Sequence, residues 1–167
     1  LMTKNDLGLH TEMLGDGTLA LVEAGVITNA CKNFHPGKLI ATFALGSARL
    51  YEFMDHNPDL EMHPVDYTNA PALASRNDNL HSMKGTLAVD FFGQCASESL
   101  GRRPFSGPGG QVDFVRAANA SNGGKSIMVV PSTAKDDSIS RIVATHEPGT
   151  PITTGKPRAI AARISST

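Results

Sequence analysis

The sequence predicts an α/β fold with an open, mainly parallel sheet flanked by helices. Two apolar runs, 37–45 and 126–130, have the near-continuous pattern of strands that are buried on both faces of a parallel sheet. The first run is followed by a turn of small residues at Gly46-Ser47 and by a helical pattern over 48–56. Strand, turn and helix in this order form the βα unit from which α/β folds are built.

Shorter patterns predict the remaining elements. Alternating apolar and polar residues indicate strands, and apolar residues at helical spacing indicate helices. Pro58 ends the helical pattern over 48–56, because the residue before a proline disfavours helical backbone. The other predicted strands are 7–11, 61–67, 85–94 and 140–143, and the other predicted helices are 18–24, which ends at Gly25, and 113–120, with a short helix or turn at 71–76.

Composition argues against several classes of protein. A chain of 167 residues fits one domain, and 40% hydrophobic with 19% charged residues is ordinary for a globular protein. A net charge of −1 gives no reason to expect nucleic acid or an anionic membrane as partner. The longest apolar runs fall short of the roughly 18 residues of a membrane span.

The two cysteines and six histidines indicate whether a metal site is expected and in which cellular compartment the protein lies. Cys31 and Cys95 lie far apart, which argues against a disulfide scaffold or a zinc site. The histidines show no metal-ligand spacing. The first residues lack the apolar core of a signal peptide. We therefore expect a cytoplasmic protein without a metal site.

A glycine-rich loop follows the strand predicted at 85–94. It places Gly107, Gly109 and Gly110 around one proline, and apolar residues return at Val112 and Phe114. Glycines lack a Cβ atom, so their N–H groups can approach an oxyanion or a phosphate closely. The loop matches neither the Walker pattern nor G-x-G-x-x-G. A plain surface turn fits the composition equally well.

Two segments resemble a known family: 79–94, and Gly107-Pro-Gly-Gly-Gln-Val-Asp-Phe-Val-Arg116. They are similar to the C-terminal half of the acetyl-CoA hydrolase/transferase family, class I CoA-transferases, above all to its 4-hydroxybutyrate and butyrate:acetate members. The resemblance runs from about residue 8 and implies a C-terminal catalytic domain over 1–154. The basic segment 155–167 matches nothing expected there.

The resemblance also implies a function. Such an enzyme moves CoA between a short-chain acyl-CoA and a carboxylate such as acetate, through a thioester between CoA and a glutamate. CoA is then a substrate, no cofactor is needed, and a homo-oligomer is possible. The family's nucleophilic glutamate falls, by this resemblance, at the position of Ala88, within Leu87-Ala-Val-Asp90.

Further site residues follow from the same resemblance. Gly109 and Gly110 are expected to donate N–H groups to the oxyanion. Contacts to CoA or substrate are expected from Gly107, Gln111, Asp113, His10, Glu12, Ser132 and Lys135. His10 and Glu12 would point the same way on a strand, into a pocket wall or along an exposed polar face. Ser132 and Lys135 follow a buried strand, where ligands bind in open α/β sheets, although a solvated loop fits too.

An alanine at position 88 cannot carry a covalent intermediate. We therefore expect this chain to be inactive as a transferase. Asp90 lies two residues further on, and we expect it to be a structural carboxylate bonded to nearby backbone rather than a substitute nucleophile. The alternatives are a non-catalytic relative that binds CoA, an acyl-CoA hydrolase that activates water directly, or a glycine turn without CoA affinity.

Overall fold

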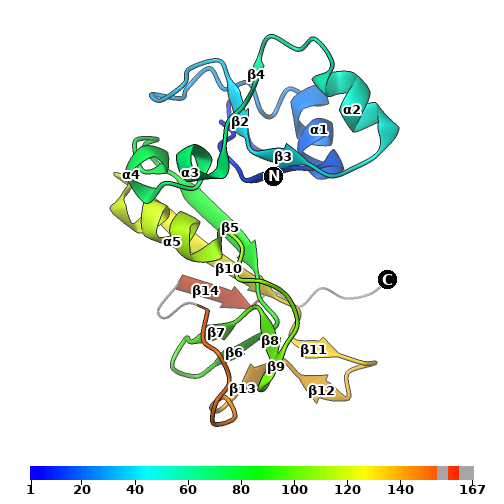
Figure 1. Cartoon of the computed structure of the whole chain (residues 1–167), viewed down its shortest axis with the longest axis vertical. Helices are drawn as coiled ribbons and strands as arrows, with labels where there is room; N and C mark the ends of the chain where they lie inside the picture. Colours follow the sequence, from blue (N-terminus) through cyan, green and yellow to red (C-terminus); the bar gives the residue numbers. More distant parts are fainter. Residues whose placement is uncertain (154–157, 162–167) are drawn as a thin grey trace. The chain divides into compact units, whose positions relative to one another are not determined.

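The computed structural model describes residues 1–153 and 158–161, and it alternates short strands with helices (Figure 1). The chain divides into two compact units, Leu1–Asp78 and Asn79–Thr167. No linker composition marks this boundary in the sequence, where a single domain was expected. Within the described residues, no helix is long and apolar enough to cross a membrane.

The first unit holds four short strands and four helices, and its strands pair in parallel. β1 pairs with β3, and β2 pairs with β4. The elements are β1 (Met13–Leu14), α1 (Asp16–Glu23), β2 (Leu39–Ala41), β3 (Phe43–Ala44), α2 (Ala48–Met54), β4 (Leu60–Met62), α3 (Val65–Thr68) and α4 (Pro71–Ala74).

A small apolar core joins these elements. Leu14, Leu19, Ala41 and Leu50, from β1, α1, β2 and α2, are buried against one another. Helix α1 ends before Gly25, whose φ of 70° is left-handed, as the sequence predicted. Helix α2 and the short helix α4 are likewise confirmed. Helices α1 and α2 therefore pack against the strands through their apolar side chains.

Three predicted strands of this unit are shorter than expected. The run 37–45 divides into β2 and β3, because the N–H groups of Thr42 and Phe43 both donate to the Glu12 carbonyl. Residues 7–11 make only isolated bridges and no continuous strand. The strand predicted at 61–67 ends at Met62, because Pro64 has no N–H for a ladder and starts α3 instead.

In its described residues, the second unit contains one long helix and several small sheets. A parallel sheet has the order β14-β10-β5, and helix α5 packs against β5 and β10 (Figure 1). A mixed sheet has the order β13-β6-β7, and two hairpins pair β8 with β9 and β11 with β12. The elements are β5 (His81–Gly85), β6 (Ala88–Asp90), β7 (Cys95–Ala96), β8 (Ser99–Leu100), β9 (Arg103–Pro104), α5 (Gln111–Ala120), β10 (Lys125–Val130), β11 (Thr133–Ala134), β12 (Ile139–Ser140), β13 (Ile142–Val143) and β14 (Arg158–Ala161).

The predicted α/β class and the mainly parallel pairing are confirmed, but small sheets replace one open sheet. Strand β10 and helix α5 match the predictions, with α5 beginning two residues early. The strand predicted at 85–94 is wrong in its second half: β6 ends at Asp90, and Phe91 and Phe92 are 76% and 73% exposed in a turn. Of the segment 155–167, predicted as a non-matching tail, 158–161 form β14 beside β10; its other residues lie outside the described part.

Candidate functional site

The predicted site residues fall in both units. His10 and Glu12 belong to the first unit, and the others belong to the second.

Glu12 lies in a loop of the first unit that backbone hydrogen bonds hold in place. Its carboxylate accepts a hydrogen bond from Asn69 Nδ2 at 2.7 Å. Its carbonyl accepts the N–H groups of Thr42 and Phe43 at 2.9 and 3.1 Å. The preceding residue, Thr11, donates its N–H to the Ile40 carbonyl at 2.9 Å. The side chain is half-buried, so a fixed carboxylate remains accessible.

His10 lies beside Glu12 in sequence and is buried. Its Nε2 is 2.8 Å from the Thr68 carbonyl, so this nitrogen carries the proton, because a carbonyl only accepts. Burial lowers the pKa of His10, against the opposing effect of the hydrogen bond to Thr68. The imidazole is therefore neutral near neutral pH. His10 and Glu12 thus reach consecutive residues, Thr68 and Asn69, at the end of α3.

Three buried side-chain oxygens next to this pair lack a hydrogen-bond partner among the described residues. They are Thr42 Oγ1, Thr68 Oγ1 and Asn69 Oδ1. Each belongs to a residue that hydrogen-bonds to His10 or Glu12. Buried polar atoms are normally paired, so these oxygens are candidates to bind water or the polar groups of a ligand.

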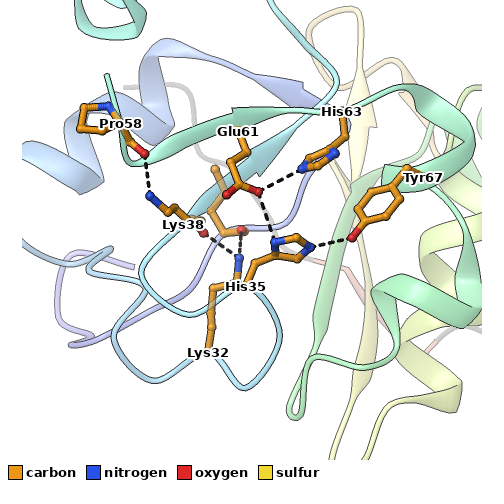
Figure 2. A network of polar contacts seen from close by, with 8 residues as sticks. Lys32, His35, Lys38, Pro58, Glu61, His63 and Tyr67 are labelled. Carbon is orange, nitrogen blue, oxygen red and sulfur yellow. Dashed lines mark hydrogen bonds and ion pairs between the residues drawn. The ribbon is translucent and has the colours of Figure 1, made fainter. Parts of the chain in front are cut away.

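A second polar cluster of the first unit, which we call the histidine cluster, consists of His35, Glu61, His63 and Tyr67 (Figure 2). One carboxylate oxygen, Glu61 Oε2, lies 3.2 Å from His35 Nδ1 and 3.0 Å from His63 Nε2. The other nitrogen of His35, Nε2, is 2.7 Å from the Tyr67 hydroxyl. The hydrogen bond with His63 lowers the pKa of the Glu61 carboxyl, so the carboxyl is ionised at neutral pH.

Lys32 lies beside the histidine cluster (Figure 2). Its Nζ donates to the carbonyls of Leu9 and Lys38 at 2.8 and 2.7 Å. Desolvation lowers the pKa of Lys32 to about 8, against the attraction of Glu61.

The histidine cluster was not predicted from the sequence. Glu61 and His63 are two residues apart, and residues at this spacing along a strand share a face. That signal was present. His35 comes from a separate segment and reaches them because β2 and β4 pair in parallel, which no spacing rule reveals.

In the second unit the glycine loop leads directly into α5. Gly110 is buried and forms the N-cap, and Gln111 begins the helix. Gly107 and Gly109 are exposed, and the φ of 53° at Gly109 is in the left-handed region that favours glycine. The first N–H groups of a helix have no intrahelical acceptor and lie at its positive end. The first turn also carries Asp113, and Gln111 is buried.

Ala88 and Asp90 lie in the short strand β6. Ala88 is half-buried and pairs with Ala96 of β7. Asp90 is buried, and its Oδ1 accepts the N–H groups of Phe92 and Gln94 at 3.0 and 2.8 Å. Asp90 is thus the structural carboxylate that we expected, since it closes the turn between β6 and β7.

Ser132 and Lys135 lie after β10, at the β11–β12 hairpin. Ser132 is half-buried, and its carbonyl accepts the Arg141 N–H at 2.9 Å. Lys135 is exposed at the turn, with a φ of 50°. The region is a paired hairpin instead of the open loop expected, so the ammonium group of Lys135 extends from a fixed turn.

The chain belongs to the acetyl-CoA hydrolase/transferase family: residues 46–160 match the family's model of the acetyl-CoA hydrolase/transferase C-terminal domain. Among curated relatives, it is 56% identical over 156 residues to the succinyl-CoA:cyclohexane-1-carboxylate CoA transferase of Geobacter metallireducens. It is 47% identical, also over 156 residues, to the 4-hydroxybutyrate coenzyme A transferase of Clostridium kluyveri. Each alignment covers 93% of this chain and 36% of the relative, so the chain spans about a third of their length.

Solved structures give the same relationship. RipA from Yersinia pestis matches with a TM-score of 0.86 and 43% identity, over 92% of this chain and 34% of that one. The 4-hydroxybutyrate CoA-transferase from Porphyromonas gingivalis matches with a TM-score of 0.78 and 36% identity, over 98% and 39%. The expected family and fold are therefore confirmed.

Proposed function

We propose that the protein containing this chain transfers CoA between a short-chain acyl-CoA and a carboxylate, with Glu12 as the covalent nucleophile. The observation that carries this proposal is the Glu12 carboxylate, half-buried and oriented by Asn69 at 2.7 Å. The relatives named as CoA transferases, at 56% and 47% identity over 93% of the chain, support the reaction type.

The reaction needs one enzyme carboxylate that forms a mixed anhydride and then a thioester with CoA, and that is restored at the end. A glutamate oxygen attacks the thioester carbon, and the CoA thiolate leaves, which gives a mixed anhydride. The thiolate then attacks the glutamyl carbonyl and releases the first acid, so that CoA is bound to the enzyme as a thioester. The incoming carboxylate repeats both steps in reverse and restores the glutamate. Each step passes through a tetrahedral oxyanion, which N–H donors close to the reacting carbonyl stabilise.

Glu12 suits this role better than position 88. The sequence resemblance calls for a glutamate, and Glu12 is the one glutamate among the predicted site residues. Its carboxylate has a hydrogen-bond donor in Asn69, whereas Ala88 offers only a methyl group in the strand β6. Under this proposal Ala88 does not make the enzyme inactive, and Glu12 takes on a catalytic role beyond the CoA contact first expected.

The test compares variants of the full-length protein. Glu12→Gln keeps the side chain's shape and its contact with Asn69 but removes the nucleophile, so exchange between acyl-CoA and acetate should fall at least about 10⁴-fold. Mass spectrometry should find a CoA thioester on the peptide with Glu12 in the unmodified enzyme and none in Glu12→Gln. Glu52→Gln, on the exposed side of α2, is the matched control and should keep full activity.

Ala88→Glu separates the two assignments. If residue 88 were the nucleophile position, this variant would gain exchange, and Glu12→Gln would leave that gain intact. An unmodified protein that binds CoA without forming any adduct would instead favour the non-catalytic relative.

A further inference from the structure

We propose that His35, Glu61 and His63 form a binding site for one zinc-like divalent transition-metal ion in the first unit. Each residue offers one ligand atom, a ring nitrogen of each histidine and a carboxylate oxygen of Glu61, and these atoms all lie within 4.8 Å of one another. The site is independent of the covalent chemistry proposed for Glu12.

The distances suit coordination by one ion. With metal–ligand bonds of about 2.0–2.1 Å, neighbouring ligands of a tetrahedral zinc ion are about 3.3 Å apart. The two Glu61 contacts, at 3.2 and 3.0 Å, are already close to that value. The two ring nitrogens would then have to approach each other by rotation of the partly buried imidazoles. The ion would replace the protons now shared between the imidazoles and the carboxylate.

The backbone holds the ligands in place before any ion arrives. Glu61 lies in β4 opposite Ile40 of β2, and the His63 N–H donates to the Ala41 carbonyl at 2.9 Å. His35 sits in a tight turn, where its carbonyl accepts the Lys38 N–H at 3.2 Å. Ligands on paired strands and a closed turn need little reordering to bind.

Tyr67 completes the arrangement. Its hydroxyl lies 2.7 Å from His35 Nε2, so the nitrogen that faces away from the ion has a partner. Such a second hydrogen bond orients most metal-binding histidines. The Tyr67 ring also stacks on His63, with centroids 4.5 Å apart and planes inclined by 21°. One side chain therefore positions both imidazoles.

The donor set indicates the class of ion. Two imidazoles and one carboxylate suit zinc, whereas magnesium and calcium favour oxygen ligands alone. Three protein ligands leave a fourth position for water or for an anion. The His35 and His63 side chains are 20% and 27% exposed, which lets an ion enter from solvent.

The test is a titration of the metal-free, full-length protein with Zn²⁺ against a chromophoric chelator. One ion per chain is expected. Tyr67→Phe keeps the stacked ring and loses only the hydroxyl, so affinity should fall about 10–100-fold. His63→Ala should weaken binding further. His56→Ala removes an exposed histidine outside the cluster and should leave affinity unchanged.

Co²⁺ gives a second readout that requires no variant to fold. Bound by two histidines and a carboxylate in a near-tetrahedral site, it should give intense visible absorption in the unmodified protein. Absence of stoichiometric binding, or equal affinities in His56→Ala and His63→Ala, would overturn the proposal.

Discussion

At the scale of single residues, His10 links burial to a dependence of stability on pH. Burial lowers the pKa of His10 in the folded chain, so the unfolded chain takes up a proton first as the pH falls through about 6.5. The free energy of unfolding therefore decreases as the pH falls below this value, by at most about 1.4 kcal/mol per pH unit for one proton. Above it the contribution is constant.

The expected outcome is that His10→Gln weakens this loss. Glutamine can still donate to the Thr68 carbonyl but does not titrate. Denaturant unfolding at a series of pH values between 5 and 8, roughly the range in which histidine titrates, gives the slopes. His56→Gln, at a histidine whose side chain is 93% exposed, should leave the slope as it was. Equal slopes for His10→Gln and the unmodified protein would contradict the argument.

At the scale of elements, α5 and the start of β10 approach so closely that only glycine fits between them. A Cβ atom at Gly124 would lie 2.1 Å from the Ala118 carbonyl oxygen and 2.8 Å from Ser121 Cβ. Gly124→Ala should therefore lower the free energy of unfolding by about 1–3 kcal/mol.

Gly85 offers the matched comparison for Gly124. It ends β5 and has nothing within 4 Å of an added Cβ. Gly85→Ala should stay within about 0.5 kcal/mol of the unmodified protein. Thermal unfolding of the two variants, followed by circular dichroism, checks the difference, and similar losses in both would show that the close approach is not the cause.

The elements also show what a sequence can predict. Periodic apolar residues located α1, α2, α5 and β10, because burial on one face or two leaves a regular pattern. The apolar pattern over 85–94 predicted a buried strand, and this prediction was wrong beyond Asp90. The Asp90 carboxylate accepts two backbone N–H groups and forms a turn, in which Phe91 is exposed. Local pattern cannot reveal which backbone groups a side chain will bind.

The candidate site residues likewise fall into those that local sequence patterns predict and those that only strand pairing brings together. The glycine loop and the His10–Glu12 pair were predicted from short sequence motifs together with the family resemblance. The histidine cluster was missed because His35 meets Glu61 only through the parallel pairing of β2 with β4. To predict contacts that arise from strand pairing, one must know the pairing register, which local sequence patterns do not reveal.

At the scale of the whole molecule, the two cysteines should behave differently. Cys31 is exposed and Cys95 is buried. A thiol reagent should modify one sulfur per chain under native conditions and the second only after denaturation. Cys31→Ser should abolish the fast reaction and leave the slow one. A fast second reaction in the folded protein would mean that the β6–β7 region opens readily.

The pairing of β14 with β10 has a consequence for the order in which the second unit is made. Strand β10 lies between β5 and β14, and residues 158–161 pair with residues 127–130 of β10. During synthesis on the ribosome, β5, α5 and β10 emerge before β14, and β10 keeps an open edge until β14 has left the exit tunnel. Open strand edges recruit other chains, so a nascent chain that pauses before residue 158 exposes the surface most prone to aggregation.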